Sequence, residues 1–114
     1  MNPDIVKYLE DIRLSIQDIE SYIVGISTSY QYRTDRKTKD SVERRLAIIG
    51  EARDKISKID NSIPITNKTK IIGLRHILVQ DYDLVNPETI WQIVKHNLPA
   101  LQLEVEQILK NSEE

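Results

Sequence analysis

The stretch IIGLRHILVQDYDLVNPETIWQIVKHNLPAL, residues 71–101, decides how the chain is organised. It contains the back half of one predicted helix, a polar break and the front of another helix. Asn86 predicts the cap of the second helix, and Pro87 its first helical position. The break is also the part of the chain richest in polar groups that could take part in chemistry: Arg75, Gln80, Asp81 and Tyr82.

Apolar residues outside this stretch follow the helical period. Asn2 and Pro3 predict the start of a first helix, and Gly25 predicts its end. Between them, apolar residues recur at alternating spacings of four and three: Ile5, Leu9, Ile12, Ile16, Ile19 and Ile23. This spacing forms one stripe along a helix.

The remaining elements follow from the same pattern. We expect a loop or weak helical turn over residues 25–36, a second long helix over about residues 37–59 and a third over about residues 65–80. Pro99 predicts a kink near Lys95, because proline cannot donate the backbone hydrogen bond to that carbonyl. No segment has the alternation of a strand. The sequence therefore predicts an all-α fold, an antiparallel bundle of four main helices with room for a fifth, short one.

Length and composition predict a single domain over residues 1–114 with a modest aliphatic core, since the chain lacks Phe and is only 39% hydrophobic. A small core favours a homodimer, in which the partner buries additional surface. The absence of Cys excludes disulfides. His76 and His96 have no partners at ligand spacing, so we expect no metal or other cofactor. Without a signal peptide or an apolar run of about 20 residues, we expect a cytoplasmic protein with no membrane segment.

Charge is unevenly distributed, although the net charge is only −2. Residues 33–58 carry nine basic and five acidic groups, and residues 66–80 carry three basic groups and no acid. The two ends of the chain are acidic. The basic middle is where a polyanion would bind, unless these charges are only solvated helix faces.

The polar groups of the break and the helix after it have a recognisable spacing. Arg75 is followed by four residues, then Gln80, one residue and Tyr82, and the next helix contains Trp91 and a Leu-Pro pair at residues 98–99. Upstream, residues 49–52 read IGEA. This arrangement resembles the HepT proteins of the HEPN superfamily, with one departure: the family has His at the position of Gln80.

The resemblance implies metal-independent RNA cleavage in a cleft shared by two protomers. A 2′-hydroxyl attacks the adjacent phosphate, the motif His moves protons, and Arg75 stabilises the charge on the phosphoryl oxygens. On one continuous helix, positions 75 and 80 point about 140° apart, so they converge only across an unwound turn or between two chains. The resemblance also places Glu51 near the active face. Without it, Glu51 is an ordinary surface carboxylate.

Gln80 changes this expectation, because an amide cannot accept or deliver a proton near neutral pH. Three explanations remain open: a natural variant that binds RNA without cutting it, a change selected because the active protein harms its host, or residual activity through Arg75 and its symmetry mate. We favour the first two.

Tyr82 corresponds to the family's site of AMP attachment by a partner nucleotidyltransferase, the MntA-type antitoxin. The alternative is a Tyr that packs its ring at a helix end. Tyr8 and Tyr22 fall within the first helix. Tyr30 and Tyr32 are expected to lack a neighbouring Arg that would bind an anion.

Three functions follow. The first is the toxin of a type VII-like toxin–antitoxin pair, a ribonuclease impaired by Gln80, with tRNA or mRNA as the target that the resemblance implies. The second is a non-catalytic binding subunit of a nucleotidyltransferase. The third is a helical dimerisation module.

Overall fold

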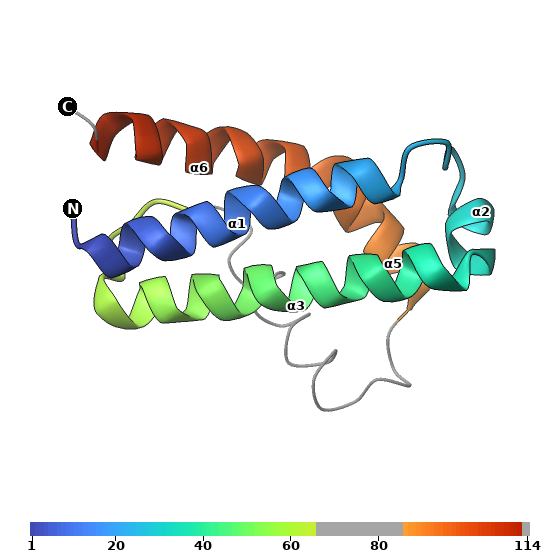
Figure 1. The fold of residues 1–114 in the computed structure, drawn as a ribbon, viewed down its shortest axis with the longest axis horizontal. Coiled ribbons are helices and arrows are strands. Elements are labelled where there is room, and N and C mark those ends of the chain that lie inside the picture. The colour runs from blue at the N-terminus through green and yellow to red at the C-terminus, as the bar shows by residue number, and fades with distance from the viewer. Residues whose placement is uncertain (66–85, 113–114) are drawn as a thin grey trace.

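The computed structural model describes residues 1–65 and 86–112, and these residues form helices joined by short connections, with no strand among them (Figure 1). This confirms the predicted all-α class. The elements are α1 (Pro3–Tyr22), α2 (Ser29–Thr34), α3 (Arg36–Ile59), α5 (Pro87–Gln92), the π-helical turn η2 (Ile93–Asn97) and α6 (Leu98–Ser112). The helix expected over residues 65–80 lies outside the described residues, apart from its first position.

Helix α1 begins where the sequence predicts and ends at Tyr22, three residues before the predicted stop at Gly25. The Asn2 side chain accepts a hydrogen bond from the Asp4 backbone N–H at 2.7 Å, and Pro3 occupies the first turn. Gly25, just after the helix, has φ of 86°, a left-handed conformation that favours glycine. A polar cap and a glycine stop therefore delimit α1.

The predicted weak turn is a short helix, α2, stabilised at its start by a capping box. Thr28 Oγ1 accepts from the Gln31 backbone N–H at 3.1 Å, and Gln31 Oε1 accepts from the Thr28 backbone N–H at 3.2 Å. Tyr32 is fully buried, and its ring stacks on Trp91 of α5 with centroids 5.6 Å apart. This stacking fixes α2 against the C-terminal part of the chain.

Helix α3 starts one residue earlier than predicted, at Arg36. Asp35 caps it by accepting a hydrogen bond from the Thr38 backbone N–H at 3.1 Å. Hydrogen bonds from the Thr38 backbone and side chain hold the pKa of the Asp35 carboxyl below its ordinary value, because they stabilise the charged form.

The C-terminal helix contains the predicted irregularity, in the form of a π-helical turn. Asn86 caps α5 by accepting from the Glu88 backbone N–H at 2.9 Å, with Pro87 in the first turn. In η2, the Leu98 backbone N–H donates to the Ile93 carbonyl, five residues back. Pro99 follows directly, and its missing N–H and bulky ring are incompatible with a regular α-turn at this point. The helix then continues as α6.

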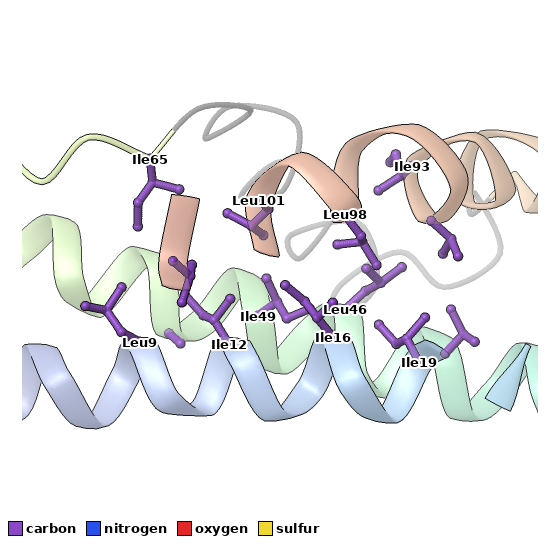
Figure 2. Close-up of a cluster of buried hydrophobic side chains, with 14 of the residues drawn as sticks. Leu9, Ile12, Ile16, Ile19, Leu46, Ile49, Ile65, Ile93, Leu98 and Leu101 are labelled. Atoms are coloured by element: carbon purple, nitrogen blue, oxygen red, sulfur yellow. The ribbon is translucent and has the colours of Figure 1, made fainter. Parts of the chain in front are cut away.

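The core is an aliphatic seam along α1, which lies between α3 and α6 and runs antiparallel to both (Figure 1). Figure 2 shows Ile12 and Ile16 of α1 directed towards Leu46 and Ile49 of α3, with Leu98 and Leu101 of the C-terminal helix on the opposite side of the cluster. The whole predicted stripe of α1 is buried except Ile23, which is half-buried. Among the described residues, no helix is long and apolar enough to span a membrane.

Candidate functional site

Of the four site residues predicted from the sequence, the structure describes one. Glu51 lies on α3, whereas Arg75, Gln80 and Tyr82 fall outside the described residues. Helix α3 is therefore the element on which the described part of the site is built. Its surface divides into a core face, a buried polar face and an exposed charged face.

Glu51 is exposed and held by a neighbouring cation. Its Oε1 lies 3.2 Å from Lys55 Nζ, one helical turn along α3. The same Nζ lies 5.4 Å from the centre of the Tyr8 ring on α1, and Lys7 Nζ lies 5.7 Å from that ring. Glu51 thus stands beside the line where α1 and α3 meet, and its second oxygen can accept hydrogen bonds from a ligand in solvent.

Two charged residues of α3 are buried, which the sequence analysis did not anticipate. Glu43 is 5% exposed and Arg53 is 3% exposed. Within the described part of the chain, Glu43 Oε2 and Arg53 Nε and Nη1 have no hydrogen-bond partner. Burial lowers the pKa of the Arg53 guanidinium, an effect that the nearby Asp54 carboxylate partly offsets. Buried charges are rare in proteins unless they are paired, so we expect polar groups to contact this face of α3.

The spacing of these residues along the sequence could have indicated that they are buried. Glu43, Leu46, Gly50 and Arg53 recur at steps of three, four and three, and all four are buried. That is the spacing of an apolar stripe, with charges at both ends and a glycine inside. The apolar residues Val42, Leu46, Ile49 and Ile56 form the core face of α3 at helical spacing. The second stripe does not follow from the apolar period, because its members are not all apolar.

The tyrosines of α2 differ sharply in environment. Tyr32 is fully buried, but Tyr30 is 63% exposed, and Arg33 Cζ lies 5.5 Å from the centre of its ring. The expectation that Tyr30 has no neighbouring Arg is therefore wrong. Residues 30 and 33 are one helical turn apart, which brings their side chains together once α2 forms.

A pocket of about 170 Å³ lies beside the π-helical turn, between the end of α1 and the start of α6. Its walls are mostly apolar, with Glu20 and Lys95 as the charged members. Lys95 also lies over the Trp91 ring, with Nζ 5.5 Å from its centre. His96 is exposed and is not among the lining residues. In the ranges 1–65 and 86–112, no group of three His, Cys or carboxylate residues could hold a metal ion.

Comparison with known proteins shows the family to which the chain belongs. A family model described as ribonuclease HepT-like matches residues 12–108. The chain belongs to this family. The matched range includes Glu51, the positions 75, 80 and 82 of the predicted motif, and the whole of η2.

Full-length relatives agree with the HepT-like assignment. "Putative RNase MJ0125" of Methanocaldococcus jannaschii is 32% identical over 111 residues, which cover 91% of this chain and 96% of that protein. "Putative RNase MJ1216" of the same organism is 31% identical, covering 96% and 91%. "Probable ribonuclease HepT" of Thermococcus cleftensis is 32% identical over 107 residues, covering 90% and 94%. No solved structure matches.

The exposure of Glu51 predicts that its contribution to stability is small. Glu51→Gln removes one exposed ion pair between residues four apart, so the free energy of unfolding should fall by less than about 1 kcal/mol. Urea denaturation followed by circular dichroism measures this. Asp54→Asn is the reference variant. Asp54 pairs with Lys58 one helical turn away at 3.1 Å and also interacts with the buried Arg53, so its loss should exceed that of an exposed ion pair alone. A much larger loss for Glu51→Gln than for Asp54→Asn would show that Glu51 has a structural role.

Proposed function

We propose that this chain is a HEPN-type ribonuclease of the HepT-like family in which cleavage is impaired and RNA binding is kept. The observation that supports this best is the family match over residues 12–108, which spans the entire predicted motif. The names of the full-length relatives agree with an RNase. Arg75 is the proposed anion-binding residue, position 80 that of the proton carrier, and Glu51 a further contact on α3.

The proposed reaction needs two contributions from the protein: proton transfer, and stabilisation of the negative charge on the phosphoryl oxygens. The 2′-hydroxyl of one nucleotide attacks the adjacent phosphorus, a P–O bond forms to it, and the bond to the 5′-oxygen of the next nucleotide breaks. A general base removes the 2′-hydroxyl proton and a general acid protonates the leaving oxygen. The Arg75 guanidinium stabilises the charge that develops on the phosphoryl oxygens.

Gln80 separates these two contributions. Its amide can donate to and accept hydrogen bonds from a phosphate or ribose, so binding at this position survives. It cannot exchange a proton with the 2′-hydroxyl or with the leaving oxygen. The alternative function, a non-catalytic subunit that helps a nucleotidyltransferase recognise its substrate, needs the same binding residues and no proton carrier.

The proposed biological setting is a two-component toxin–antitoxin pair. In it, an MntA-type nucleotidyltransferase attaches AMP to Tyr82, two residues from Gln80. The added phosphates would repel RNA and occupy the anion site of Arg75. The proposed active unit is a homodimer, because positions 75 and 80 of an ideal continuous helix would point about 140° apart, and a second protomer can supply the complementary group.

Restoring the proton carrier tests the proposed ribonuclease. Gln80→His should raise the rate of RNA cleavage by about 10²–10⁴-fold, the usual contribution of a general acid or base. Adding Arg75→Ala in that background should abolish the gain. Denaturing gels of labelled tRNA and mRNA after incubation with each variant measure this. A Gln80→His protein that is folded and dimeric but inert would favour the binding-subunit function.

The proposed shared cleft requires a dimer. Multi-angle light scattering should give about twice the chain mass of 13.3 kDa at protein concentrations of tens of micromolar. The Gln80→His variant should give the same mass, since the proposed role of position 80 is in the reaction. A monomeric mass for both proteins would remove the shared-site mechanism.

Tyr82 should be modified when the chain is incubated with its cognate nucleotidyltransferase, ATP and Mg²⁺. Intact-mass measurement and peptide mapping should locate the added AMP at Tyr82, and Tyr82→Phe should abolish it. Tyr30→Phe is the critical control, because Tyr30 is the tyrosine of α2 that is exposed and has an Arg over its ring. Labelling that persists in Tyr82→Phe and disappears in Tyr30→Phe would place the regulatory site on α2.

A further inference from the structure

The exposed face of α3 carries cations in line with Glu51. Lys37, Arg44 and Glu51 are each seven residues apart, so they lie nearly above one another on the helix. All three are exposed. From the rise of the helix, Arg44 lies about 10 Å and Lys37 about 21 Å from the level of Glu51. Arg33 of α2 adds a further exposed cation just before α3 starts. We call Arg33, Lys37 and Arg44 the α3 basic stripe.

The cations of the stripe differ from their neighbours in forming no ion pair with a carboxylate among the described residues. Arg45 pairs with Asp18 of α1 at 3.3 Å, and Arg36 lies 4.0 Å from Asp40. In the described part of the chain, no ion pair involves any of the three stripe residues. Asp35, which lies between Arg33 and Lys37 in sequence, caps α3 with its carboxylate, and the Lys37 charge helps to lower the pKa of that carboxyl. Lys37 is therefore partly offset by Asp35, whereas Arg33 and Arg44 form no ion pair with the described residues.

Tyr30 adds an exposed aromatic ring next to Arg33 on α2. Its side chain is 63% exposed, and the Arg33 guanidinium carbon lies 5.5 Å from the ring centre. The capping box of Thr28 and Gln31 fixes the turn that carries both residues. An exposed ring beside a guanidinium is a surface on which a nucleobase can stack, with the cation close enough to contact its phosphate.

We propose that the α3 basic stripe and Tyr30 form an RNA-binding track that leads single-stranded RNA towards Glu51. This rests on the proposed function, because it assigns the route by which the substrate of that site approaches. The phosphates contact Arg33, Lys37 and Arg44, and one base stacks on Tyr30. A nucleic-acid strand fits this surface because spaced cations beside an exposed aromatic ring match its phosphates and bases.

Salt-dependent binding tests the track. The probe is a fluorescein-labelled single-stranded RNA of about 20 nucleotides, titrated with the full chain while anisotropy is recorded at several salt concentrations. K37Q/R44Q should weaken binding about tenfold at low salt. It should also reduce the slope of log affinity against log salt by about 1.4, the value for two lost phosphate contacts on a single strand. Y30L should weaken binding about tenfold with an unchanged slope, because stacking releases no counterions.

K110Q is the control. It removes one exposed positive charge near the end of α6, at the end of the bundle opposite α2 (Figure 1) and away from the residues around Glu51. Its affinity and slope should stay close to those of the unmodified chain. Circular dichroism melts of all variants report whether each remains folded.

The outcomes separate the track from the ribonuclease. If K37Q/R44Q binds RNA as the control does, or the unmodified chain binds no RNA, the track is wrong. If K37Q/R44Q binds RNA normally but no longer associates with the nucleotidyltransferase, the surface is a protein contact and the track is equally wrong. If K37Q/R44Q loses affinity while the Gln80→His variant still does not cleave RNA, the RNA-binding track is supported and the proposed ribonuclease activity is wrong.

Discussion

The structure depends on the contact between the aliphatic stripe of α1 and the core face of α3. Ile12, Ile16, Leu46 and Ile49 are all almost completely removed from solvent. Burying each such side chain contributes about 1.5–3 kcal/mol, and this contact is the most extensive between helices of the described residues. The chain contains no Phe, so branched aliphatic side chains fill the space between the helices. Their close packing fixes the rotation of α3 about its own axis, and with it the direction of every other side chain on that helix.

Because α3 cannot rotate, the spacing of its residues decides which group faces which environment. Residues 42, 46, 49 and 56 contact the core, whereas residues 37, 44 and 51 face solvent. Glu43, Gly50 and Arg53 form the third, buried polar face. Buried charges on that face destabilise the folded chain unless they are paired. Any group that packs against this face must therefore supply polar partners. The packing of α3 against α1 therefore sets the direction of both the exposed and the buried charged residues of α3.

The helices could be predicted because their signals are local. Asn2, Asn86 and Asp35 are caps whose hydrogen bonds join neighbouring residues. The period of the apolar residues can likewise be recognised within the sequence of a single helix. The short helix α2 was less predictable, since its stability depends on Tyr32 stacking on Trp91, almost sixty residues later. Pro99 predicted a disturbance near Lys95, but its form as a π-helical turn depends on the tertiary packing of Val94 and Leu98. The buried charges of Glu43 and Arg53 were missed because charge alone predicts exposure.

The candidate site residues show the same difference between features that the local sequence predicts and features that depend on tertiary structure. Glu51 was singled out by resemblance, and the structure adds its pairing with Lys55 and its position in line with Lys37 and Arg44. The Arg33–Tyr30 contact follows from a spacing of three residues, yet that spacing has meaning only if residues 29–34 are helical. Tertiary structure therefore converts a basic composition into an oriented surface. Positive charge spread over residues 33–58 would attract any polyanion, whereas charge aligned on one face of a fixed helix, ending at a carboxylate, can hold a strand in one direction.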